Sequence, residues 1–162
     1  MPFGAHRGQT GTSRKTTDQL NLPLLFRYLP GMYVVMSADP KFHVVAISRG
    51  WMQATMTPLE AMVGQPLFDA FPGNPDEDCP GIVALRASLQ RILQTSQDES
   101  LPVALYQMML PEGLVNRYWK PTNTAVLNTC GRLAFILHHV EDLSQEYQAE
   151  SRCSPAMSNT GR

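Results

Sequence analysis

The chain has 162 residues, 43% of them hydrophobic, which is enough for one domain with a sizeable core and too little for two. Its 13 basic and 14 acidic side chains nearly cancel, so no overall positive field favours nucleic acid as a partner. Three widely spaced cysteines form neither a CxxC pair nor a disulfide framework, and no segment reads as a secretory signal or a membrane span. We therefore expect a cytoplasmic protein that binds neither nucleic acid nor membranes.

Composition divides the chain into three parts. Residues 1–17 are rich in glycine, serine, threonine and basic residues, and residues 151–162 are polar with glycine and proline. Neither segment can bury much apolar surface, so both are predicted to be disordered. Residues 18–150 form the predicted domain.

The domain opens with a short helix over residues 21–29, which Pro30 and Gly31 end. Asn21 is a good N-cap, and a proline is tolerated in the first helical turn. The expected buried stripe of this helix consists of Leu25, Tyr28 and Leu29.

Two strands, further helices and three more strands follow. Residues 32–37 and 42–48 are rich in β-formers and flank the turn-forming pair 39–40, which predicts an antiparallel hairpin. Short helices are expected between 49 and 71. Residues 80–95 predict a longer helix, because apolar side chains recur there with a period of 3.6.

The last part of the domain reads as three strands and a helix. Pro121 indicates a bend or an edge within the second of these strands, and Gly131 suits the hairpin turn that follows it. The predicted strands are 101–110, 115–127 and 132–140, and the predicted helix is 142–150. Five strands in a 2 + 3 split, with helices between, indicate an α+β fold: one antiparallel sheet with helices over one face.

Short motifs stand at the joints of this order. They are Leu-Pro-Gly-Met-Tyr at 29–33, Asp39, Met-Val-Gly-Gln-Pro-Leu-Phe at 62–68, Phe-Pro-Gly-Asn-Pro at 71–75, Arg-Tyr-Trp-Lys-Pro-Thr-Asn at 117–123 and His-His-Val-Glu-Asp-Leu-Ser at 138–144. Together they resemble the PAS domain family over residues 20–147, most of all bacterial PAS sensor domains of histidine kinases and hybrid regulators. The last motif looks like a variant of the D-I-T ending that leads from a PAS sheet into its output helix.

The resemblance implies a PAS-like five-stranded sheet and a role in signal sensing, protein association or both. The chain ends soon after Asp142, which leaves no room for a kinase domain. We therefore expect a stand-alone sensor of a two-component system, a partner subunit or a fragment of a longer sensor, without catalytic output. The expected partner is a second copy of the chain or a signalling protein such as a histidine kinase.

A small apolar ligand, if one exists, would lie between the sheet and the helices. The candidate pocket residues are Tyr33, Val35, Val45, Trp51, Leu89, Leu105, Trp119 and Ile136. Strand alternation fixes which residues share a face but does not say which face is inside. The signal would leave through the terminal helices, where Leu24, Leu25, Leu143 and Tyr147 form a candidate dimer seam.

The cofactor is left unknown, and neither haem nor flavin is expected. Haem in PAS domains is usually held by a histidine on the long helix, and residues 80–95 contain none. Cys79 lacks the motif of a photoreactive cysteine. The acidic run 76–78 does not match a calcium-binding loop and is interpreted as charge that favours the start of the long helix, so no metal site is predicted.

Two other readings remain open. One is a protein-interaction module that dimerises without any ligand. The other is a small α+β enzyme that pairs His138 or His139 with Asp142. Adjacent strand residues point to opposite faces, so only one of these histidines can face the interior. No nucleophile elbow and no phosphate-binding loop occur, so an enzyme is not expected.

Overall fold

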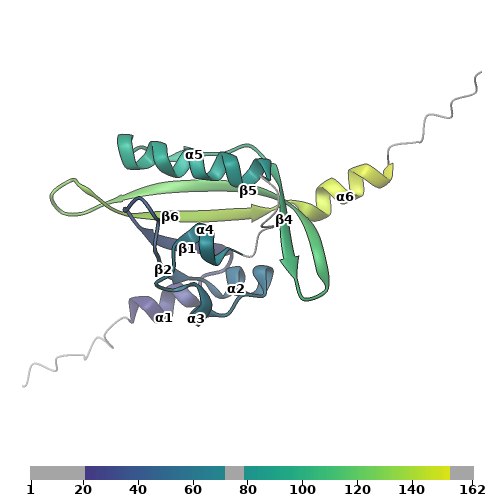
Figure 1. The fold of residues 1–162 in the computed structure, drawn as a ribbon, viewed down its shortest axis with the longest axis horizontal. Helices are drawn as coiled ribbons and strands as arrows, with labels where there is room; N and C mark the ends of the chain where they lie inside the picture. The colour runs from purple at the N-terminus through teal and green to yellow at the C-terminus, as the bar shows by residue number, and fades with distance from the viewer. Residues whose placement is uncertain (1–20, 72–78, 154–162) are drawn as a thin grey trace, which may run out of the picture.

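The computed structural model describes residues 21–71 and 79–153, with the side chains of 150–153 excepted. Short helices separate two groups of strands along the chain (Figure 1). The elements are α1 (Leu22–Arg27), β1 (Met32–Ser37), β2 (Val44–Ile47), α2 (Arg49–Thr55), α3 (Leu59–Met62), α4 (Leu67–Ala70), α5 (Pro80–Thr95), β3 (Glu99–Ser100), β4 (Ala104–Leu110), β5 (Gly113–Leu127), β6 (Leu133–Asp142) and α6 (Ser144–Cys153).

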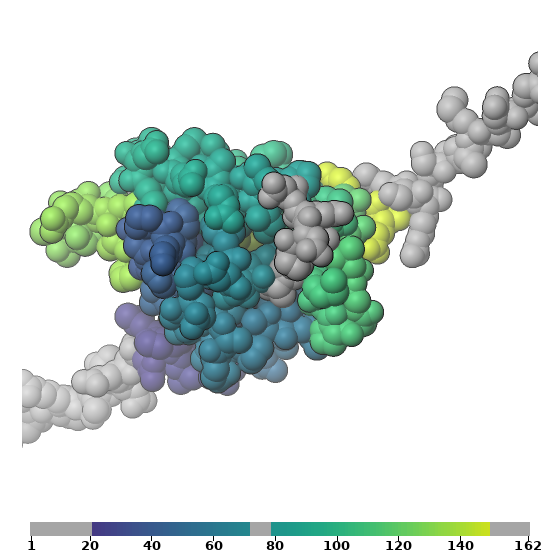
Figure 2. Space-filling view, in the orientation of Figure 1, coloured from purple at the N-terminus to yellow at the C-terminus, as the bar shows by residue number. Residues whose placement is uncertain are grey.

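The strands form one antiparallel sheet in the order β2-β1-β6-β5-β3, and β4 pairs with β5 as well. This confirms the predicted α+β architecture with its 2 + 3 split. The prediction lacks only β3, a strand of two residues. Helices α2 to α5 supply the residues that pack on one face of the sheet, and Figure 2 shows them covering that side.

Side-chain alternation separates an inner face of the sheet from an outer one. In β1, Met32, Val34 and Met36 are buried, whereas Tyr33 and Val35 are half-buried on the opposite side. The strand registers carry this parity to the neighbours, so the inner face also includes Ile136, His138 and Val140 of β6 and Trp119, Pro121 and Asn123 of β5.

Ser48 joins three elements at the start of α2. Its Oγ donates to the Gly31 carbonyl (2.8 Å) and accepts from the backbone N–H groups of Tyr33 (2.9 Å) and Trp51 (3.3 Å). Beside it, a Cβ at Gly50 would lie 2.3 Å from the Gly31 carbonyl oxygen, so only glycine lets α2 come this close. These contacts hold Trp51 over the inner face.

The predicted buried stripe of the first helix is wrong. Leu25, Tyr28 and Leu29 are 49%, 64% and 36% exposed, and α1 buries no residue. The helix ends before Tyr28 and lies beside the edge strand β2 rather than over the core, so it has no interior to face. Its main inward contact is Phe26, edge-on to Tyr33 with ring centroids 6.4 Å apart.

Pro121 lies in an interior strand, not at an edge, but it meets a gap in the neighbouring strands. It pairs with Val140 of β6 on one side. On the other side its carbonyl accepts from Leu101, where β3 and β4 are interrupted over residues 101–103. A proline costs no ladder hydrogen bond at such a gap.

Two other predictions from local sequence signals are confirmed. Helix α5 has the predicted bounds, and Gly131 takes φ +73° in the hairpin turn between β5 and β6. Helix α6 runs on to Cys153, beyond the predicted end at 150. Of the segments predicted to be disordered, 1–17 and 151–162, residues 151–153 belong to α6. Residues 1–17 and 154–162, and the acidic run 76–78, lie outside the described residues.

Candidate functional site

An aromatic cluster occupies the space between the sheet and the helices. Trp51 and Trp119 are each 1% exposed, with ring centroids 6.0 Å apart. Phe71 packs against both, and Tyr106 lies 5.3 Å from Trp119. The His138 ring meets Trp51 edge-on at 5.7 Å. The region expected to hold a ligand is therefore occupied by large rings that contact one another.

A chain of polar groups crosses the same interior. His138 Nδ1 lies 2.6 Å from Asn123 Oδ1, and Asn123 Nδ2 donates to Ser88 Oγ of α5 at 2.9 Å. Ser88 also hydrogen-bonds Glu99, which forms an ion pair with Arg91 at the surface. The chain therefore links β6, β5, α5 and β3 from the core to solvent.

His138 is held neutral inside the protein. Complete burial lowers the pKa of its imidazole to about 3, and the adjacent His139 contributes a smaller effect of the same sign. Because Asn123 donates its amide to Ser88, its carbonyl faces His138, so the Nδ1 atom carries the imidazole proton. A neutral, hydrogen-bonded histidine of this kind ties β6 to β5 inside the core.

The start of α6 is fastened to β5. The Tyr118 N–H donates to Ser144 Oγ at 2.9 Å, and the Leu143 N–H donates to the Tyr118 carbonyl at 2.8 Å. The Asp142 carboxylate accepts from both the N–H and the hydroxyl of Ser144. The Tyr118 ring stacks on Tyr147 one turn into α6, with centroids 4.8 Å apart. The motif at 138–144 thus forms the joint between sheet and helix.

The structure brings together only half of the predicted pocket residues. Trp51, Leu89, Trp119 and Ile136 are buried in the core. Tyr33, Val35 and Leu105 have the opposite strand parity and are half-buried on the outer face, and Val45 is 45% exposed beside the irregular step in the β1–β2 register. The outer-face position of Tyr33 is marked by its stacking on His139 at 4.5 Å.

The four predicted seam residues lie in two separate places. Leu24 and Leu25 are exposed on α1, whereas Leu143 and Tyr147 belong to the region of α6, at the other end of the molecule (Figure 1). Leu24 lines a groove of about 340 Å³ between α1, β2 and α3, which otherwise consists mostly of apolar side chains.

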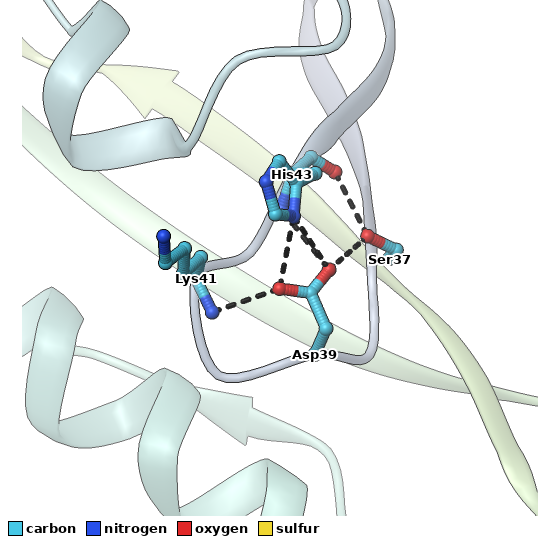
Figure 3. A network of polar contacts seen from close by, with 4 residues as sticks. All are labelled: Ser37, Asp39, Lys41 and His43. Carbon is cyan, nitrogen blue, oxygen red and sulfur yellow. Dashed lines mark hydrogen bonds and ion pairs between the residues drawn. The ribbon is translucent and has the colours of Figure 1, made fainter.

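The turn between β1 and β2 contains a serine, an aspartate and a histidine in contact (Figure 3). The Asp39 carboxylate accepts from Ser37 Oγ and from the Lys41 N–H, and lies 3.0 Å from His43 Nδ1. Burial alone would raise the pKa of Asp39, but these hydrogen bonds outweigh it and hold the pKa far below its usual range. A hydrolytic triad needs the histidine between acid and serine, and here the acid lies in the middle. The cluster therefore stabilises the turn.

Sequence reasoning did not find the polar members of the interior. Asn123 stands in the motif at 117–123, but only the pairing of Asn123 with His138 shows that both face inward. Ser88 lies on the buried stripe of α5 and looks like a small core residue in the sequence. The available signal was their spacing from apolar, buried residues. Asn123 lies on the same strand face as Trp119, and Ser88 lies on the same helix face as Leu85.

The described residues contain neither a cluster of metal-binding side chains nor a membrane-spanning helix. Within 21–71 and 79–153, no three or more histidine, cysteine, aspartate or glutamate side chains gather where they could hold a metal ion. In the same part of the chain, no helix has both the length and the apolar character needed to cross a membrane.

Comparison with known proteins finds similarity in structure but not in sequence. No family model and no curated protein matches the chain. A light-oxygen-voltage (LOV) protein of Rhodobacter sphaeroides is similar with a TM-score of 0.61 and 12% identity, over 82% of this chain and 70% of that one. A PAS domain from Colwellia psychrerythraea has a TM-score of 0.55 and 12% identity, over 75% and 93%.

The PAS domain of the fruit-fly ELK potassium channel has a TM-score of 0.54 and 14% identity, over 70% of this chain and 87% of that one. At identities of 12–14%, these three similarities show the fold alone. The resemblance inferred from the motifs and the structural similarity agree: the chain has the PAS fold.

Proposed function

We propose that the chain is a non-catalytic signal-sensing module in which changes in the aromatic interior reach α6 through β5. The observation that carries this proposal is the pair Tyr118–Trp119. Trp119 lies in the core. The preceding residue, Tyr118, points to the other side of the strand and holds the start of α6. A displacement of one side chain therefore moves the backbone that anchors the other.

Each step of this path is a ring contact or a backbone hydrogen bond. Trp119 contacts Trp51, Phe71 and Tyr106, and of these four rings it alone belongs to β5, the strand that holds α6. The N–H and carbonyl of Tyr118 are both committed to the α6 joint. A shift in β5 must therefore stretch or re-form these bonds.

Amide hydrogen exchange of α6 tests the proposal with two matched variants. Trp119→Phe should raise exchange in 145–153 several-fold, because it changes the strand that holds the helix. Trp51→Phe removes an equally buried indole from α2 and should leave α6 near the wild-type rate. Equal exchange in α6 for both variants and wild type contradicts the coupling.

We further propose that the output is association with a second copy of the chain through α1 and α6. The exposed leucines of α1 support this, because a six-residue helix without buried side chains gains no stability from burial within its own chain. Leu25→Asp and Leu143→Asp should each reduce the mass measured by light scattering, and the control Val83→Asp, on exposed α5 surface, should not. If the wild type is monomeric, the homodimer is excluded, and a different signalling partner, such as a histidine kinase, is expected.

A second candidate function is association without any ligand. The packing of rings in the core favours it, because these side chains already occupy the space in which a ligand would lie. Native mass spectrometry with an absorption spectrum of purified protein separates the two. A bound mass or a chromophore band supports sensing, and a bare dimer mass supports pure association.

A further inference from the structure

A groove lies at the β2 edge of the sheet, apart from the aromatic cluster. Helices α1 and α3 both contact β2, and the three elements lie together in Figure 1. The space that they enclose measures about 340 Å³, at the lower end of the range for small-molecule sites. None of Trp51, Trp119 and Tyr106 lines it, so the groove is separate from the interior between the sheet and the helices.

The groove has a firm floor. Ile47 of β2 lines it and is only 1% exposed. Beside Ile47, the Val44 N–H donates to the Gln65 carbonyl at 2.9 Å, and the Val44 carbonyl accepts from the Gly64 N–H at 2.7 Å. These two bonds hold the segment that follows α3 against β2, so the groove is built by the fold itself.

The walls of the groove are aliphatic and open to solvent. Leu24 is 52%, Val45 45% and Val63 38% exposed, and all three line the groove. Exposed apolar side chains that gather around one groove indicate binding, whereas the same side chains scattered singly do not. The lining contains one aromatic ring, that of Phe26, which already meets Tyr33 edge-on. Walls of this kind suit a flexible hydrocarbon chain better than a flat ring.

Arg27 gives the groove a single positive charge. It is the only charged side chain among the described residues that line the groove, and it forms no ion pair with any of the residues that the structure describes. Asn21 is the other polar lining residue, and its Oδ1 already caps α1 by accepting from the Leu24 N–H at 3.0 Å. A guanidinium binds a carboxylate through two parallel hydrogen bonds, and one arginine balances one carboxylate.

We propose that this groove binds a medium-chain carboxylate, with the acyl chain on the aliphatic walls and the head group on Arg27. The site goes beyond the proposed function, because it lies apart from Trp119 and α6 and its ligand acts on α1. Helix α1 buries no side chain within its own chain. A bound acyl chain covers Leu24, Val45 and Val63 and supplies the apolar contacts that fix α1 against β2 and α3.

Octanoate, titrated below its micelle concentration, tests the site through the methyl NMR signals of valine. The signals of Val45 and Val63 should shift saturably, and that of Val83, 51% exposed on α5, should stay in place. Octanol, which keeps the chain but lacks the carboxylate, should bind about fivefold more weakly. Unmoved Val45 and Val63 signals overturn the site, and equal or tighter binding of octanol or octylammonium overturns the carboxylate class. Shifts of these signals with protein concentration alone assign the groove to a second copy of the chain and also overturn the proposal.

Two matched pairs of variants at exposed positions sharpen the test. Arg27→Gln should weaken octanoate about fivefold and leave octanol unchanged, whereas Arg132→Gln, in the β5–β6 turn, should change neither. Val45→Asp should abolish octanoate binding, whereas Leu127→Asp, at a similar exposure of 49%, should not. Octanoate binding that survives Val45→Asp, or that is unaffected by Arg27→Gln, contradicts the proposal. The outcome is independent of α6 exchange in Trp119→Phe, so this site and the proposed coupling fail separately.

Discussion

The two ends of the sheet differ in how completely their polar side chains are hydrogen-bonded. At the β1–β2 end, Asp39 receives a serine hydroxyl, a backbone N–H and a histidine, and Ser48 forms three hydrogen bonds. At the β4–β5 end lie all the unpaired buried side-chain donors of the described residues. Complete pairing indicates a structural role. At the other end the interior leaves three donors unpaired, which costs stability.

Acidification gives the largest effect expected from the interior. The pKa of His138 is lowered to about 3 in the fold, below the ordinary value of 6.5, so the unfolded chain takes up its proton first. Stability should be complete above pH 6.5 and fall by about 3 kcal/mol between pH 6.5 and 4. Urea unfolding at several pH values measures this, with His138→Gln as the control in which the slope flattens. An equal slope in His138→Gln would falsify this assignment.

Loss of the Ser48 hydroxyl should be the costliest substitution at the satisfied end. Ser48→Ala leaves two backbone N–H groups and one carbonyl without their partner and should destabilise the fold by about 2–3 kcal/mol. Thermal unfolding measures it against Ser100→Ala, an exposed serine of β3. A shift no larger than that of the control contradicts the role of Ser48 as the junction.

The turn in Figure 3 should contribute less. Asp39→Asn keeps the shape but loses the charge that accepts these hydrogen bonds, which should cost about 1–2 kcal/mol at pH 7. The pKa of Asp39 is lowered in the fold, so its contribution is present above the unfolded value near 4 and disappears as pH falls below it. Wild type and variant should therefore converge in acid. A constant difference down to pH 2 argues against the carboxylate as its source.

The smallest expected effect is a change in stability at the β4–β5 end, with a sign opposite to that of the changes at the β1–β2 end. Tyr106→Phe removes a hydroxyl that has no partner within the described residues, so the ligand-free protein should keep its stability or gain up to about 1 kcal/mol. Differential scanning calorimetry of dialysed protein measures it. A loss of more than 1 kcal/mol shows that the hydroxyl is already satisfied, and the contrast between the two ends then disappears.

Local chemistry allowed much of the fold to be predicted. The spacing of apolar residues set the bounds of α5, and glycine in the turn at 128–131 set the β5–β6 hairpin, because both signals act within a few residues. The buried stripe of α1 failed because burial depends on where the helix docks, which its own sequence does not encode. The helix lies at the rim, beside β2.

The candidate site was less accessible from sequence, for a related reason. Alternation grouped Tyr33 with Val35 correctly but could not say that they face outward. The unpaired hydroxyl of Tyr106 could not be predicted, because whether a buried hydroxyl finds a partner depends on residues far away in the chain. Trp119 was found because a large indole in a strand is conspicuous on its own.

A double-mutant cycle tests the central claim, that the interior and α6 are energetically coupled through β5. Trp119→Phe combined with Ser144→Ala should deviate from additivity by about 0.5–1 kcal/mol in free energy of unfolding, because both act on the backbone at Tyr118. Trp51→Phe combined with Ser144→Ala should be additive within about 0.3 kcal/mol. Additivity in both cycles contradicts the account, since an interior that does not sense α6 cannot signal through it.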